Sequence, residues 1–270
     1  MVNQRDRTET NTLRTVLATR YITPLREGGS LPAVIEADDG ALYVMKFSGA
    51  GQGTKALIAE LVAGEIARTL GLRVPELVFV ELREGIGRNE PNAEIQDLLR
   101  ASIGLNLGVA YLPSAFAYNQ LLKPPDPRLA SEIVWFDAYV TNVDRTARNV
   151  NLLIWQNELW LIDHGASLYF HYNWGNYREQ SKTPFSMIRQ HTLLPYAAEI
   201  EAADARLAPR LTEAELRRIV DLTPSVWLGQ EPAFADEAEH RAAYVEYLLT
   251  RLNASSIFVE EAVNARAKLS

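Results

Sequence analysis

Cysteine is absent from the sequence of 270 residues. This absence excludes disulfide bonds, thiolate nucleophiles and metal sites built on cysteine. An excess of basic residues is also lacking, because 27 Lys and Arg face 34 Asp and Glu and give a formal net charge of −7. Surfaces that bind nucleic acid or anionic membranes normally need clustered Lys and Arg. We therefore expect neither nucleic acid nor a membrane as a partner.

Long apolar runs are missing too, since no run approaches the roughly 20 residues that a membrane-spanning helix needs. The first six residues, MVNQRD, are polar and charged, which is not the pattern of a secretory signal. A hydrophobic fraction of 47% and a charged fraction of 23% are ordinary for a globular protein. We expect a cytoplasmic protein with one large domain or two packed lobes.

The most informative stretch runs from Asp144 to Asp163. Asn149 follows Asp144 by five positions, and Asp163 follows two apolar segments of strand length, residues 151–155 and 158–162. The dipeptide QN between these segments is turn-prone, so they predict a β-hairpin. A hairpin brings its two ends together, so we expect Asn149 and Asp163 to lie close in space.

These side chains carry the oxygen atoms that phosphoryl transfer requires. Asp144 can accept the proton of an attacking hydroxyl, while the Asn149 amide oxygen and the Asp163 carboxylate can hold magnesium on nucleotide phosphates. Magnesium is a hard cation that prefers oxygen ligands. The stretch therefore predicts a site for ATP and Mg²⁺, with Asp144 as catalytic base and Asn149 and Asp163 as metal ligands.

Residues 142–149, with the sequence NVDRTARN, resemble the catalytic loop of the HipA-like kinases, which carry an Asn-x-Asp-x-His-x-Lys-Asn pattern. The DRxxxN portion is also similar to lipid kinases of the phosphoinositide type. Thr146 stands where these patterns often have His, and Arg148 stands where the HipA-like kinases have Lys. The triplet DHG at 163–165 replaces the Asp-Phe-Gly of eukaryotic protein kinases.

The resemblance implies an α+β, two-lobed protein-kinase-like fold. A small β-rich lobe with one helix would span residues 1–112 and bind the nucleotide, and a larger helical lobe would span residues 113–270. Members of the HipA-like group are serine/threonine kinases, so the resemblance implies a Ser or Thr of a protein as the phosphoryl acceptor. A small-molecule or lipid hydroxyl is the next alternative.

The N-terminal half contains the remaining parts expected of a kinase. Residues 33–37 and 41–47 flank the turn signal DDG and predict a hairpin that ends near Lys46. Residues 54–70 have a helical apolar pattern, with Thr54 as a possible N-cap. In kinases, a strand lysine at this place contacts the phosphates and pairs with a helix glutamate.

Two glutamates on this helix compete for the partnership with Lys46. Glu60 and Glu65 lie about 140° apart around the helix axis, so only one can readily face the lysine. Alignment with the HipA-like pattern favours Glu60.

The resemblance also implies where the nucleotide binds. Gly28, Gly29 and Ser30 would form a loop over the phosphates. Tyr111 and Leu112 would lie in the linker between the lobes, where backbone groups receive the adenine.

Two alternatives come from other functional classes. The loop GAGQG at 49–53, between a strand and a helix and followed by the strand 77–80, imitates a dinucleotide-binding unit. That interpretation leaves Asp144, Asn149 and Asp163 without a role. A nucleotide-binding pseudokinase or scaffold is the second alternative, because Thr146 and the DHG triplet depart from the kinase patterns.

Several segments remain open between a functional and a structural interpretation. Asp137, in a predicted helix at 130–140, is either a second functional carboxylate or a buried tie to the loop below it. Arg145 or Arg148 could counter charge on the transferred group or pair with surface acids. The aromatic stretch 169–177 could form a substrate wall or pack in the core.

Overall fold

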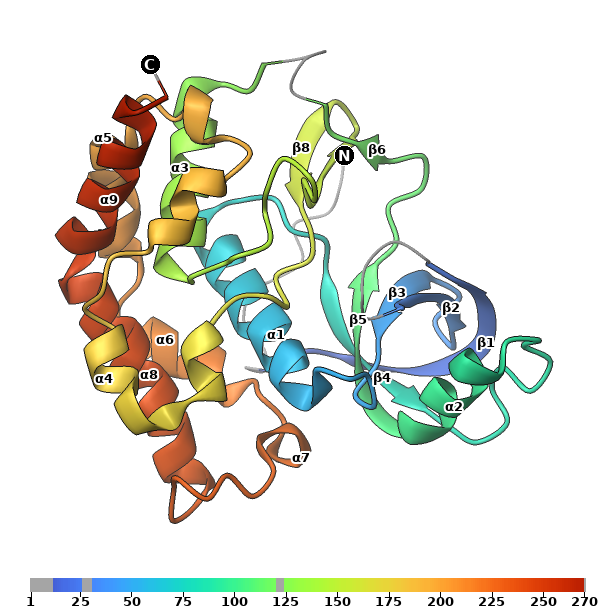
Figure 1. The fold of residues 1–270 in the computed structure, drawn as a ribbon. Helices are drawn as coiled ribbons and strands as arrows, with labels where there is room; N and C mark the ends of the chain where they lie inside the picture. The colour runs from blue at the N-terminus through green and yellow to red at the C-terminus, as the bar shows by residue number, and fades with distance from the viewer. Residues whose placement is uncertain (1–11, 26–30, 120–123, 270) are drawn as a thin grey trace.

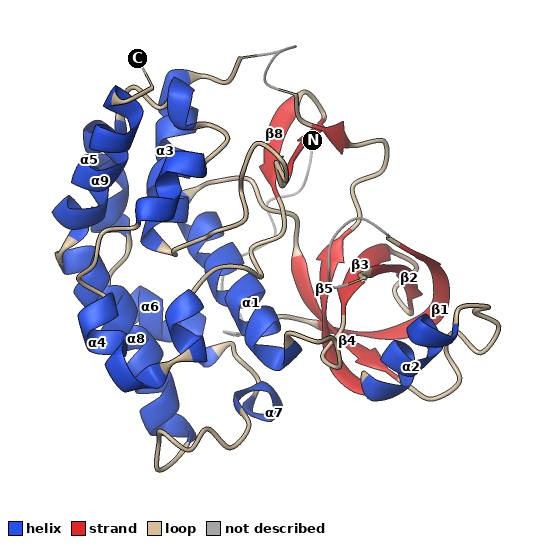
Figure 2. Ribbon diagram, viewed as in Figure 1, coloured by secondary structure: helices blue, strands red, loops and turns tan. Residues whose placement is uncertain are grey.

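The computed structural model describes residues 12–25, 31–119 and 124–269. Figure 1 shows a β-barrel beside a larger body of helices, with a small sheet between the two at one edge. The fold is therefore α+β, as expected. Figure 2 shows most helices on one side of the molecule, while α2 (Ala93–Ala101) lies against the barrel and α1 (Gly53–Leu70) runs along the boundary.

The barrel is closed by five strands in the order β1-β2-β3-β5-β4. Neighbouring strands are antiparallel except for β1 and β4, which pair in parallel, with Val16 opposite Val80. Apolar side chains such as Ile35, Met45 and Val78 fill the interior. The strands are β1 (Thr15–Pro24), β2 (Ala33–Ala37), β3 (Leu42–Lys46), β4 (Leu77–Leu82) and β5 (Gly104–Ala110).

Strand β3 directs Lys46 out of the barrel. Residues Tyr43 and Met45 are buried in the barrel core, so the alternate residues, Val44 and Lys46, point to the opposite face. Val44 packs against the core that the helices form. The alternation thus places Lys46 at the boundary between barrel and helices.

Helix α1 (Gly53–Leu70) is buried along most of its length and belongs to the core of the helical body. It ends at Gly71, whose φ of 84° is the left-handed conformation that glycine adopts readily. The expectation of Thr54 as N-cap is wrong. Gln52 is the N-cap, and the Thr54 hydroxyl instead donates to the carbonyl of Trp227, 2.7 Å away.

The helical body is built around α3, which begins at an Asp126 N-cap with Pro127 in its first turn. Helices α5 and α9 pack against it, and α6 packs against α8. The helices are α2 (Ala93–Ala101), α3 (Pro127–Tyr139), α4 (Tyr177–Gln180), α5 (Ile200–Leu207), α6 (Glu213–Asp221), α7 (Ser225–Leu228), α8 (Glu237–Asn253) and α9 (Ser255–Ala267). Short 3-10 turns lie at Tyr169–Tyr172, Trp174–Asn176, Ser186–Gln190, Leu194–Tyr196 and Ala208–Arg210.

The predicted hairpin near the acidic motif is present as β7 (Leu152–Trp155) and β8 (Glu158–Leu161). The turn residues Gln156 and Asn157 have φ values of 51° and 63°, which is the backbone of a type I′ hairpin turn. A two-residue strand, β6 (Phe116–Ala117), extends the sheet beside β7.

Two sequence expectations change at the level of the fold. The described part of residues 1–112 contains two helices rather than one, since α2 is present beside α1 and packs Ile95 and Leu99 into the barrel core. The dinucleotide-binding alternative is wrong, since that unit needs neighbouring parallel strands around its helix. Strand β5 separates β3 from β4 here and is antiparallel to both.

In the part of the chain that the structure describes, no helix combines the length and apolar character that crossing a bilayer requires.

The barrel packing predicts that Gly108 tolerates no side chain. A Cβ there would lie 2.7 Å from Val80 Cγ2 and 2.9 Å from Val78 Cγ2. We expect Gly108→Ala to lower the free energy of unfolding by about 1–3 kcal/mol, as overpacking does. Urea denaturation measures it. Gly51→Ala is the matched control, because nothing lies within 4 Å of its Cβ. Equal stability of the two variants would contradict the close approach of β5 and β4.

Candidate active site

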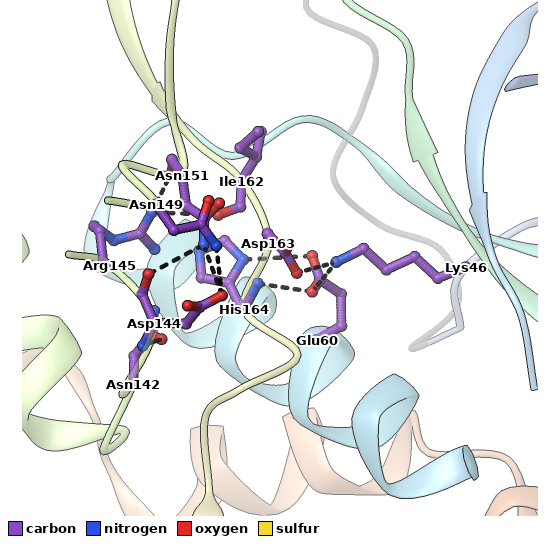
Figure 3. Close-up of polar contacts among 10 residues, drawn as sticks. All are labelled: Lys46, Glu60, Asn142, Asp144, Arg145, Asn149, Asn151, Ile162, Asp163 and His164. Atoms are coloured by element: carbon purple, nitrogen blue, oxygen red, sulfur yellow. Dashed lines mark hydrogen bonds and ion pairs between the residues drawn. The ribbon is translucent and has the colours of Figure 1, made fainter. Parts of the chain in front are cut away.

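Lys46, Glu60 and Asp163 meet at the boundary between the barrel and the helices (Figure 3). Lys46 Nζ lies 2.5 Å from Glu60 Oε2 and 2.7 Å from Asp163 Oδ1. The lysine comes from the end of β3, the glutamate from the middle of α1, and Asp163 from the segment after β8. Three distant parts of the chain thus supply one ammonium group and two carboxylates.

The charges of this cluster stabilise one another. Burial would lower the pKa of Lys46, but the charges of Glu60 and Asp163 outweigh it and raise the pKa above its ordinary value. Burial would raise the pKa of Glu60, yet the charge of Lys46 and hydrogen bonding from His164 hold it below its usual range. Both groups are therefore ionised near neutral pH.

Glu60, and not Glu65, is the helix residue that faces Lys46. Its carboxylate also accepts a hydrogen bond from the backbone N–H of His164 at 2.7 Å, which anchors the segment after β8 to α1. Glu65 lies near Arg68 instead, with 3.2 Å between Glu65 Oε1 and Arg68 Nε. The predicted choice between the two glutamates agrees with this geometry.

Asp144 and Asn149 lie together at the other side of Asp163. Asn149 Nδ2 donates to Asp144 Oδ2 at 2.7 Å, and Asn151 Nδ2 lies 3.4 Å from the same oxygen. Because the amide nitrogen of Asn149 bonds to Asp144, its amide oxygen is the atom available to a cation. The Asp144 backbone N–H donates to the Asn142 side chain at 3.1 Å, which shapes the loop.

The Asp144 carboxyl titrates above its ordinary range. Its pKa is raised first by burial and then by the charge of Asp163, while hydrogen bonds from Asn151 and Asn149 work in the opposite direction. Figure 3 shows Asp144 and Asp163 within the same group of side chains. A raised pKa brings a carboxylate closer to the range that suits a general base.

A second buried ion pair anchors the loop that carries Asp144 and Asn149. Arg145 Nε lies 2.6 Å from Asp137 Oδ2, and both side chains are fully buried. Arg145 also donates to the carbonyls of Asn151 and Ile162, at the two ends of the hairpin. His191 Nε2 lies 2.8 Å from the same Asp137 oxygen. Arg145 is therefore a structural residue, and the hypothesis that it counters charge on the transferred group is wrong.

The structural alternative also holds for Asp137. Burial would raise its pKa, but Arg145 and His191 keep the pKa below its usual range, so Asp137 is a buried anion with its partners in place. Arg148, by contrast, is exposed.

The donor set fits a hard divalent cation. Asp144, Asn149 and Asp163 offer two carboxylates and an amide oxygen, which is the chemistry that Mg²⁺ prefers. Among the residues that the structure describes, no group of three or more His, Asp or Glu side chains could hold a metal by itself.

Not every predicted site residue belongs to this cluster. Gly28, Gly29 and Ser30 lie outside the described residues. Tyr111 and Leu112 follow β5 and lead towards β6, with the Tyr111 N–H donating to Leu42 O at 3.0 Å. They occupy the connection between the barrel and the rest of the chain, and their contact with adenine stays a prediction.

Some residues around the site were not predicted from the sequence. His164 is fully buried, packs edge-on against Phe136, and its Nδ1 lies 3.6 Å from Glu60 Oε1. Asn151 supports Asp144, and its position two residues after Asn149 could have indicated this. Nothing local in the sequence indicated that Lys46 contacts Asp163 directly.

The aromatic stretch 169–177 is mostly core. Phe170, Trp174 and Tyr177 are buried, and the ring of Phe170 stacks on Tyr247 with centroids 3.5 Å apart. Tyr169 remains 60% exposed. The packing interpretation therefore holds for the buried members of this stretch.

Comparison with known proteins gives a consistent result. A family profile described as "HipA-like kinase" matches residues 19–260. The crystal structure of the proinflammatory kinase CtkA from Helicobacter pylori is similar with a TM-score of 0.53 and 13% identity, over 96% of this chain and 99% of that one. At this identity the similarity concerns the fold alone.

Two structures of a Golgi casein kinase also match. One, with Mn/ADP bound, has a TM-score of 0.48 and 11% identity, covering 93% of this chain and 74% of its own. The other has a TM-score of 0.49 and 10% identity, covering 95% and 75%. No curated protein sequence matches the chain.

The Asp137–Arg145 pair predicts a large difference between two arginines of one loop. Arg145→Met would leave Asp137 buried without its main partner and should lower the free energy of unfolding by about 3–5 kcal/mol. Arg148→Met is the matched control and should change it by no more than about 0.5 kcal/mol, as is usual for exposed sites. Chemical denaturation of both variants checks this. Similar small effects in both would contradict the buried pair.

Proposed function

The chain belongs to the HipA-like kinase family, and on that premise we propose that it transfers the γ-phosphoryl group of ATP to a hydroxyl group. A serine or threonine of a protein is the proposed acceptor, which the resemblance of residues 142–149 to the HipA-like catalytic loop supports. The single observation that carries the proposal is the meeting of Lys46, Glu60 and Asp163, with Asp144 and Asn149 beside them.

Lys46 would brace the phosphates of ATP. Its ammonium group lies between two carboxylates, and Glu60 holds it in place from α1. When ATP binds, the phosphate oxygens would share the ammonium group with Asp163, which is 44% exposed and therefore accessible. Gly28, Gly29, Ser30, Tyr111 and Leu112 are proposed to contribute further contacts to the nucleotide.

Asp144 would act on the acceptor. Its carboxylate accepts the proton of the attacking hydroxyl while the hydroxyl oxygen bonds to the γ-phosphorus. The bond from that phosphorus to the bridging oxygen of ADP breaks, and ADP leaves with the electron pair. Hydrogen bonds from Asn149 and Asn151 hold the Asp144 carboxylate in one orientation for this step.

Asn149 and Asp163 are the proposed ligands for Mg²⁺. The cation would neutralise charge on the phosphates of ATP. Its ligands lie on the loop and on the segment after the hairpin, which β7 and β8 bring to the same end of the sheet.

The proposal includes a division of the chain into two lobes. The barrel, within residues 1–112, would be the smaller nucleotide-binding lobe, and residues 113–270 would be the larger catalytic lobe. Helix α1 belongs to the first by sequence and packs with the second. It therefore links the two parts through Glu60.

Replacement of the proposed base tests the reaction itself. Asp144→Asn keeps the shape of the side chain but cannot accept the proton, so phosphoryl transfer should fall by about 10²–10⁴-fold. The measurement is incorporation of label from γ-labelled ATP into a Ser/Thr peptide library and into the protein itself. Asp97→Asn on α2, where the aspartate is exposed, is the control and should leave the rate unchanged.

This experiment also separates a kinase from a pseudokinase. Saturation with ATP and Mg²⁺ at about 100 times Kd should stabilise the wild type and Asp144→Asn alike by about 2.7 kcal/mol. Stabilisation without transfer by the wild type would favour a nucleotide-binding scaffold. Equal transfer by wild type and Asp144→Asn would remove Asp144 from the mechanism.

The proposed metal ligands predict a change in magnesium requirement. Asn149→Ala and Asp163→Asn should raise the Mg²⁺ concentration for half-maximal transfer by at least about tenfold, since loss even of outer-shell partners costs that much. Titration of Mg²⁺ at fixed ATP, after removal of metal with EDTA, gives the value. Asp221→Asn, an exposed residue at the end of α6, serves as control. An unchanged requirement in both site variants would place the cation elsewhere.

A further inference from the structure

A cavity with a basic lining lies away from the cluster of Lys46 and Asp144. It has a volume of about 760 Å³ and lies among the C-terminal half of α1, the loop to β4, strand β8 and helix α6. Its charged lining consists of four arginines and two glutamates: Arg68, Arg73, Arg210, Arg218, Glu65 and Glu215. Together with Glu158, the ion-pair partner of Arg73, three negative groups face the four positive ones and leave an excess of one positive charge, whereas the whole chain carries −7. The cavity is thus locally basic on an acidic protein.

Two buried polar atoms of the lining have no hydrogen-bond partner among the described residues. One is Glu65 Oε1, which lies 3.2 Å from Arg68 Nε without hydrogen-bond alignment, in a residue that is 9% exposed. The other is the indole nitrogen of Trp160 on β8. Buried polar groups are nearly always hydrogen-bonded, so a donor without a hydrogen bond and an acceptor held only by its ion pair with Arg68, beside one cavity, indicate a ligand that bonds to both.

The arginines retain donors for an anion. Arg218 donates through Nε and Nη2 to a single oxygen of Glu215, and Arg73 forms an exposed ion pair with Glu158 at 3.1 Å. A guanidinium group has five N–H donors, so each of these contacts leaves others for a ligand. Planar guanidinium groups match carboxylate and phosphate oxygens well.

We propose that this cavity is a binding site for a small organic anion that carries a hydroxyl group. The phosphate or carboxylate group would accept hydrogen bonds from the arginines and from the Trp160 indole. The hydroxyl group would donate to Glu65. Such a molecule would supply the hydrogen bonds that both atoms lack and would offset the excess positive charge.

Helix α1 and strand β8, which both line the cavity, are also close in sequence to residues of the proposed catalytic cluster. Glu65 lies five residues after Glu60 on the same helix, and Trp160 lies three residues before Asp163. The Leu161 N–H donates to the Arg73 carbonyl at 2.8 Å, which joins β8 to the loop that follows α1. A ligand between these walls would hold α1 and β8 in one relative position. Coupling to ATP affinity rests on the proposed function, whereas anion binding does not.

The Trp160 indole N–H provides a direct readout. The chain has five tryptophans, so the indole region of a ¹H–¹⁵N spectrum is simple, and Trp160→Phe identifies the resonance of Trp160. We expect glycerol 3-phosphate or glycerate to shift this resonance in a saturable way, while glycerol leaves it in place. A response to only one of the two anions identifies the head group.

Variants locate the binding. Arg73→Gln combined with Arg218→Gln should raise the Kd of the anion by about tenfold or more, equivalent to about 1.4 kcal/mol of binding free energy. Arg100→Gln, an exposed arginine on α2, is the matched control and should bind as the wild type does. The proposal is overturned if neither anion shifts the Trp160 resonance, if glycerol shifts it equally, or if the double variant binds the anion unchanged.

A separate titration tests the coupling. Saturating anion should tighten ATP binding by about fivefold in the wild type and not in the double variant. An unchanged ATP affinity would remove the coupling. Absence of ATP binding under all conditions would count against the proposed function and would leave the spectroscopic test intact.

Discussion

The ammonium group of Lys46, held between Glu60 and Asp163, is the interaction on which the arrangement of the molecule depends. A charge that is largely removed from water is costly unless opposite charges lie beside it. Here the compensating charges come from α1 and from the segment after β8, so the barrel, the helix and the hairpin must meet at one place. The same requirement that orders these three elements also collects the groups that a phosphoryl-transfer site needs.

A second buried ion pair, between Asp137 and Arg145, anchors the loop that carries Asp144 to the hairpin. Arg145 donates to the carbonyl just before β7 and to the carbonyl just after β8. Asp137 also accepts a hydrogen bond from Asn142 and lies in contact with His191. The loop is thereby supported from below, while Asp144 and Asn149 face the opposite side towards Asp163. The two neighbouring residues Asp144 and Arg145 therefore have different tasks, one at the site and one in the core.

The parts of this arrangement that local sequence encodes were predictable. Apolar segments on either side of QN and of DDG predict hairpins. Asp144 and Asn149 precede one hairpin and Asp163 follows it, so the hairpin predicts that they lie near one another. The nonlocal parts were not predictable in this way. Closure of the barrel depends on the parallel pairing of β1 with β4, with Val16 opposite Val80, which no local sequence pattern indicates. The burial of Arg145 and the role of Thr54 depend on Asp137 and Trp227, partners that only the tertiary fold brings near.

The central claim is that one cation and one nucleotide bind where Lys46, Asn149 and Asp163 converge. Crystals grown with a non-hydrolysable ATP analogue and Mn²⁺ in place of Mg²⁺ test it most directly, because Mn²⁺ is located by its anomalous scattering. The account predicts an anomalous peak in bonding contact with the oxygens of Asn149 and Asp163, and phosphates beside Lys46. A peak away from both residues, or a nucleotide that does not contact Lys46, would contradict it.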